Sequence, residues 1–106
     1  MKSWQDIYDV IAEDATGRSI FRPGVYLDGE WRPETMCVMG GLALAAGLDI
    51  RSRYLGTSQV VDFVYDNYPL TFDQCNYLVS VNDNHTNLEA RRVALISQVR
   101  EYEEEA

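Results

Sequence analysis

The segment from Met36 to Ala46 contains no polar side chain, and this constrains the fold more than any other feature of the sequence. A helix with this composition is apolar around its whole circumference, so other parts of the protein must surround it. Pro33 suits the first position of such a helix, and Gly47 suits its end. The apolar run is too short to span a bilayer. The sequence therefore predicts a central, buried helix.

Two further segments have the period of helices that pack one face on a core. Trp4, Ile7 and Ile11 recur at helical spacing after Ser3, which can cap the helix N-terminus. Val60–Val64 is rich in β-branched residues, which also suits a strand, but its apolar spacing is closer to the helical period. We therefore expect a first helix after Ser3 and a third helix through Val60–Val64.

Capping motifs predict the last two helices. Thr71–Gln74 has the T-x-x-Q form of a capping box and Thr86–Glu89 has the T-x-x-E form. Between the first two helices, Asp28-Gly29 separates two short runs of strand-forming residues, which is typical of a tight β-hairpin. The expected fold is thus all-α, a small bundle of about five helices with a short β-hairpin between helices 1 and 2.

Length and charge restrict the classes of function. A chain of 106 residues with 46% hydrophobic residues fits a single helical domain over residues 1–106. The net charge is −8, and residues 54–106 carry nine acidic residues against three basic ones. Contacts with nucleic-acid phosphates or with an anionic membrane surface require Lys and Arg. We therefore expect no direct nucleic-acid or membrane partner, whereas a basic protein partner fits the charge.

The two cysteines, Cys37 and Cys75, both lie in apolar runs. Two cysteines cannot form the dense disulfide framework of a small secreted protein, and the N-terminal residues lack the apolar stretch of a signal peptide. We expect a cytoplasmic protein with reduced thiols that behave as small hydrophobic side chains. A nucleophilic role would need His85, the only histidine, beside one of the thiols.

The most polar cluster of the chain is Asn82-Asp83-Asn84-His85-Thr86. A metal site would use Asp83 and His85, yet no second histidine or cysteine lies at the usual ligand spacing, and a closed site needs about four ligands. The structural interpretation is a turn between two helices in which a polar side chain caps the next helix. We expect no bound metal and no cofactor, and we keep both interpretations of Asn82, Asp83, His85 and Thr86.

Three aromatic residues surround the expected hairpin: Phe21, Tyr26 and Trp31. If their rings pack on the central helix, they belong to the core. If they are exposed, they form the kind of Tyr and Trp patch that anchors a protein interface. The sequence leaves both alternatives open.

Two blocks of the chain resemble an uncharacterised family of small proteins from actinobacteria and their phages. Cys37-Val-Met-Gly40-Gly41-Leu-Ala-Leu-Ala-Ala46 is similar to that family's C-x-x-G-A-[LI]-x-x-A-A helix. Val81-Asn82-Asp83, followed by Thr86 and Glu89-Ala90, is similar to its hydrophobic-Asn-Asp, Thr and acidic-helix ending. This chain differs in having Gly41 and Val81 where the family commonly has Ala and an aromatic residue. The resemblance implies a helical fold and a microbial or phage origin, and it implies no activity.

These observations favour a protein-interaction module that is not an enzyme, such as a phage or mobile-element accessory protein that binds a host protein. A homodimer is also compatible with the sequence. The first alternative is a small enzyme or metal-dependent protein centred on Asp83 and His85 with a cysteine. The second is an acidic inhibitor that mimics DNA through Asp62, Asp66 and Glu103–Glu105.

Overall fold

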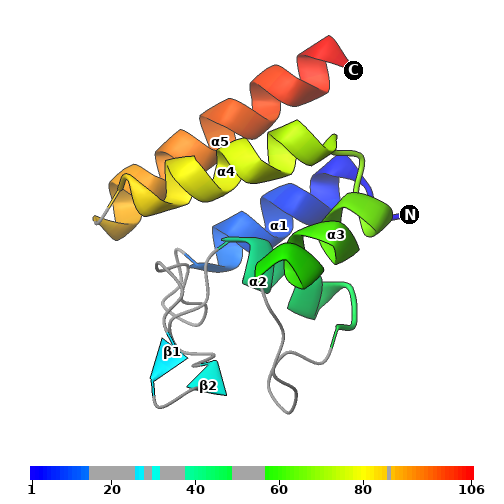
Figure 1. Cartoon of the computed structure of the whole chain (residues 1–106). Coiled ribbons are helices and arrows are strands. Elements are labelled where there is room, and N and C mark those ends of the chain that lie inside the picture. Colours follow the sequence, from blue (N-terminus) through cyan, green and yellow to red (C-terminus); the bar gives the residue numbers. More distant parts are fainter. Residues whose placement is uncertain (15–25, 28–29, 32–37, 49–56, 86) are drawn as a thin grey trace.

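The computed structural model describes residues 1–14, 26–27, 30–31, 38–48, 57–85 and 87–106. The described part contains five helices (Figure 1), which confirms the all-α bundle. The helices are α1 (Trp4–Asp14), α2 (Val38–Ala45), α3 (Thr57–Asn67), α4 (Phe72–Asp83) and α5 (Leu88–Glu105). In Figure 1, α4 lies between α5 and α3, and α5 packs against both α1 and α4.

Between α1 and α2, the strands β1 (Tyr26–Leu27) and β2 (Glu30–Trp31) pair antiparallel, with Tyr26 opposite Trp31 and Leu27 opposite Glu30. Each strand is only two residues long, so this pair adds little regular structure to a helical protein. The Asp28-Gly29 turn and the outer ends of the two expected strand segments, Val25 and Arg32, lie outside the described residues. The hairpin as a whole therefore stays a prediction.

One hydrophobic core draws side chains from all five helices. α2 lies at the centre of this core, because it contacts α1, α3 and α4. Its residues from Val38 to Ala43 are all buried. This confirms the central apolar helix, although Ala45 at its end is exposed. The predicted start at Pro33 lies outside the described residues. The largest fully buried side chains are Tyr68, Ile7, Ile11, Met39, Leu42, Leu78, Leu95, Val38, Val64 and Val99.

α2 ends at Ala45, and Gly47 closes it two residues later, as the sequence predicts. Gly47 has a φ of 101°, the left-handed conformation that glycine adopts without strain. Its N–H donates to the carbonyl of Leu44 at 3.1 Å, and the N–H of Leu48 donates to the carbonyl of Ala43 at 3.0 Å. This pair of hydrogen bonds is a Schellman motif, which satisfies carbonyl groups that the helix end would otherwise leave unpaired.

Side-chain caps begin α1 and α4 where the sequence places them. The Ser3 N–H donates to Asp6 at 2.7 Å while the Asp6 N–H donates to the Ser3 hydroxyl at 3.2 Å. Thr71 and Gln74 form the expected capping box, with reciprocal hydrogen bonds of 2.9 and 3.1 Å. The hydrogen bonds from Ser3 lower the pKa of Asp6 below its ordinary value, because they favour the ionised carboxylate.

The last helix begins differently from the prediction. α5 starts at Leu88, and its cap is Asn87, whose side-chain oxygen accepts a hydrogen bond from the Ala90 N–H at 3.0 Å. The prediction that the T-x-x-E box at Thr86–Glu89 begins this helix was therefore wrong. Asn and Thr are both good caps, and Asn87 makes the same type of bond one residue later.

Residues Val60–Val64 are helical, so the strand alternative is wrong. Val60, Val61 and Val64 are buried at helical spacing, and Phe63 is half-buried. Burial of this stripe against α2 and α4 outweighs the modest helix cost of β-branched side chains.

Candidate functional site

Asn82 is fully buried, and it connects two helices that are far apart in the sequence. Its side-chain oxygen accepts a hydrogen bond of 3.2 Å from the backbone N–H of Val38, the first residue of α2. Its side-chain nitrogen donates to Asp83 at 3.3 Å. The side chain of Asn82 therefore joins α4 to α2 in the interior, and it does not point into solvent where a ligand could reach it.

The rest of the polar cluster holds the junction between α4 and α5 together. The Nδ1 atom of His85 lies 2.7 Å from the carbonyl of Val81, and since a carbonyl only accepts, Nδ1 carries the proton. The guanidinium of Arg91, which is buried, donates through Nε to the carbonyl of His85 at 2.8 Å. Asp83 is exposed. These contacts are those of a stabilised turn between helices.

The contacts do not assemble a metal site from the predicted residues. Among the residues that the structure describes, no group of three or more His, Cys, Asp and Glu side chains is placed to hold a metal ion. Asp83 and His85 thus remain two candidate ligands without a described third. Thr86 lies outside the described residues.

Cys75 belongs to α4, and its side chain is fully buried in the core. Burial raises the pKa of its thiol from 9.0 to about 11, because the interior disfavours the charged thiolate. A thiol that is buried and protonated is a poor nucleophile. Cys75 behaves as the small hydrophobic side chain that the sequence predicts, whereas Cys37 lies outside the described residues.

The prediction of an interface formed by the hairpin aromatics Phe21, Tyr26 and Trp31 stays a prediction. The backbones of Tyr26 and Trp31 are paired, but their side chains and all of Phe21 lie outside what the structure describes. Exposed rings occur instead on α3 and α4. Tyr65, Phe72 and Tyr77 have exposed fractions of 47%, 46% and 55%, and every other aromatic side chain that the structure describes is buried or half-buried.

Tyr65 and Phe72 contact each other across the connection between α3 and α4. Their ring centroids lie 6.3 Å apart, and the ring planes meet at 82°, an edge-to-face arrangement. Sequence reasoning missed Tyr65, Phe72 and Tyr77, although one signal was present for Tyr77. On α4 the helical period places Cys75, Leu78 and Asn82 on one side and Tyr77 on the opposite side.

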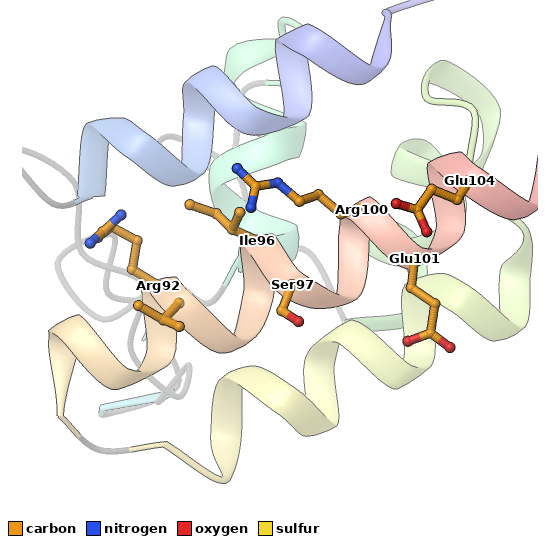
Figure 2. A pocket seen from close by; sticks show the side chains of 7 residues that line it. Arg92, Ile96, Ser97, Arg100, Glu101 and Glu104 are labelled. Atoms are coloured by element: carbon orange, nitrogen blue, oxygen red, sulfur yellow. The ribbon is translucent and has the colours of Figure 1, made fainter.

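An open depression of about 680 Å³ runs along the outer surface of α5. Figure 2 shows that its side chains come from this one helix, with Arg92 and Arg100 directed toward α1 and Glu101 directed toward α4. Arg92 is paired with Glu89 one turn earlier. Because charges of both signs line an open surface on a single helix, the depression does not define a preference for one class of ligand.

A second shallow surface lies where α1 meets α5, and it contains a side-chain contact between the two ends of the chain. The Tyr8 hydroxyl donates to Glu103 at 2.9 Å. Desolvation and the neighbouring Glu103 carboxylate raise the pKa of Tyr8 to about 12. The contact joins α1 to the C-terminal part of α5.

No helix in the described part of the chain has the length and apolar character needed to cross a membrane. Comparisons of the chain with protein-family models, with curated proteins and with solved structures gave no match. The interpretation of function therefore depends on the chain's own surface.

Proposed function

We propose that this chain is a protein-interaction module that catalyses no reaction, and that it binds its partner through the exposed rings of Tyr65 and Phe72. The observation that supports the proposal is the edge-to-face contact of two aromatic side chains that are each about half exposed. Rings already ordered by each other lose little conformational entropy when a partner covers them, and aromatic side chains are common among the residues that dominate binding energy.

The sequence resemblance adds a biological setting to this proposal. If the chain is related to the small actinobacterial and actinophage proteins, it acts as a phage or mobile-element accessory protein that binds a host protein in the cytoplasm. Asn82, in the second block of the resemblance, then has a structural role, since its side chain accepts a hydrogen bond from Val38 in the first block.

The test is capture of partners from bacterial lysate by the full chain and by two matched double variants. Tyr65→Ser/Phe72→Ser removes the two rings, whereas Leu88→Ser/Val93→Ser removes two exposed apolar side chains of α5. We expect a protein that the wild type and the α5 variant retain and that the ring variant loses. No protein above the level of empty beads, or equal retention by all three chains, would contradict the proposal.

The DNA-mimic alternative has one observation in its favour, because Asp62, Asp66, Asp73 and Asp83 are all exposed. Under this alternative the captured protein binds DNA and competes with DNA for the chain. Neutralising Asp62 and Asp66 to Asn would then abolish capture, while Tyr65→Ser/Phe72→Ser would leave it unchanged.

A further inference from the structure

The exposed rings lie on a surface that we call the α3–α4 face, defined by Asp62, Tyr65, Asp66, Phe72, Asp73 and Tyr77. All six side chains are exposed. The face has no large apolar neighbour covering it in the described part of the chain, although α3 and α4 pack against each other beneath it. It therefore presents aromatic surface that remains available to a partner.

The helical period fixes how the residues of α4 are arranged on this face. Asp73 and Tyr77 are four residues apart, so they lie one above the other on the side of α4 opposite the buried Cys75. Phe72 lies at the border with α3, where it meets Tyr65. Asp73 thus directly follows Phe72 in the chain and lies one helical turn before Tyr77 on α4.

The charge of the same stretch has one sign. Residues 57–83, which contain all of α3 and α4, include four aspartates and no Lys, Arg or His. Beyond α4, the side toward α5 also carries acidic groups: burial raises the pKa of the Tyr102 phenol, and Tyr77, Glu101 and Glu105 around it raise this pKa further. A partner that covers the rings must approach through a negative potential.

We propose that the α3–α4 face binds a cationic polypeptide segment, in which arginine side chains stack on the rings of Tyr65, Phe72 and Tyr77 and pair with the aspartates beside them. This inference rests on the proposed function and names the chemistry of the partner. Arginine satisfies both features of the face, because its planar guanidinium stacks on aromatic rings and pairs with carboxylates. Lysine provides the charge but stacks less well.

The probe is a 12-residue peptide of alternating Arg and Ala, titrated into the isotopically labelled full chain and followed by amide NMR shifts. The same peptide with citrulline in place of Arg keeps the planar group and removes the charge, and a Lys version keeps the charge and removes the planar group. We expect the largest shifts in α3 and the first half of α4, with affinity decreasing in the order Arg, Lys, citrulline.

Three double variants separate a local site from attraction by net charge. Asp62→Asn/Asp73→Asn and Asp9→Asn/Glu104→Gln remove the same number of charges, but the second pair lies on α1 and in the depression of Figure 2. We expect the first pair to weaken binding by about fivefold or more and the second by less than about twofold. Tyr65→Ser/Phe72→Ser should weaken binding as much as the first pair.

Equal weakening by both charge variants, or shifts spread over the whole surface, would overturn the inference. Self-association through this face, measured by sedimentation at the concentrations used, would also overturn it, because the occupant would then be a second copy of the chain. If lysate capture depends on Tyr65 and Phe72 but the peptide does not bind locally, the interaction module stands and the cationic partner is wrong. If lysate capture fails as well, both proposals are wrong.

Discussion

The side-chain oxygen of Asn82 and the backbone N–H of Val38 form a buried hydrogen bond across 44 residues of sequence. Val38 is the first described residue of α2, and Asn82 belongs to α4. A side chain of α4 therefore satisfies a buried backbone N–H of α2 from across the fold. The same bond joins the two blocks on which the family resemblance depends, and it gives both a structural meaning.

Replacing Asn82 by Ala should lower the free energy of unfolding by about 1–3 kcal/mol, because a buried N–H at Val38 loses its partner. Asn76→Ala is the matched control, since Asn76 is exposed on the same helix and bonds only the carbonyl of Phe72. It should cost less than about 0.5 kcal/mol. Urea unfolding measures both values, and similar costs for the two variants would contradict a stabilising role of the Asn82–Val38 hydrogen bond.

Tyr68→Phe should destabilise the protein by about 0.5–1.5 kcal/mol. The buried Tyr68 hydroxyl donates to the carbonyl of Leu42 at 2.6 Å. That carbonyl also accepts from the Ala46 N–H at 3.1 Å, so it keeps a partner and the cost stays moderate. Tyr65→Phe, at an exposed position, should leave the thermal midpoint unchanged. A stability loss from Tyr65→Phe equal to that from Tyr68→Phe would show that the Leu42 contact contributes nothing.

Alkaline pH should destabilise the native state through Cys75. Its pKa is about 11 in the folded chain against 9.0 for an ordinary thiol, so the folded state binds more protons between these values. This contribution to stability is complete below pH 9 and disappears as the pH rises toward 11. We expect the free energy of unfolding of wild type to fall more steeply than that of Cys75→Ala over this window.

Tyr8 and Tyr68, whose pKa values are both raised to about 12, titrate in the wild type and in Cys75→Ala alike. Their effect therefore cancels in the comparison. Parallel pH profiles for the two chains would mean that the Cys75 thiol ionises as readily in the folded chain as in the unfolded one.

Thr71→Ala should cost about 1 kcal/mol, because it removes the hydroxyl that accepts from the Gln74 N–H at the start of α4. Ser80→Ala is the control, since Ser80 is exposed within the same helix and Ala has the higher helix propensity. Thermal unfolding should show a lower midpoint for Thr71→Ala and no decrease for Ser80→Ala. The reverse order would exclude the capping box as a stabilising element.

Sequence patterns predicted the elements whose causes are local. The apolar segment around Leu42 gives a central helix, and the Thr71 box begins α4, because both depend on residues within a turn or two. The exact cap of α5 was missed because Thr86 and Asn87 are adjacent and both are capable caps. The two candidate caps differ by a single position, and the local sequence pattern does not distinguish between them.

The role of Asn82 and the exposed rings required the tertiary structure. Asn82-Asp83-Asn84 has the composition of a surface turn, and the partner of Asn82 lies on a helix 44 residues earlier. Tyr65 and Tyr68 are one helical turn apart and of the same residue type, yet one is 47% exposed and the other 1%. Which of them is covered depends on where α2 and α4 pack against α3, and a single-sequence pattern does not specify that packing.

The bond from Val38 to Asn82 also has a consequence during protein synthesis. The most apolar helix of the chain is made before the residue that bonds its Val38 N–H, and at about 5–20 residues per second the delay between Val38 and Asn82 is about 2–9 s. During that interval α2 has neither this bond nor the complete α4 surface on which it packs. The buried position of α2 is therefore completed only when the second half of the chain has been made.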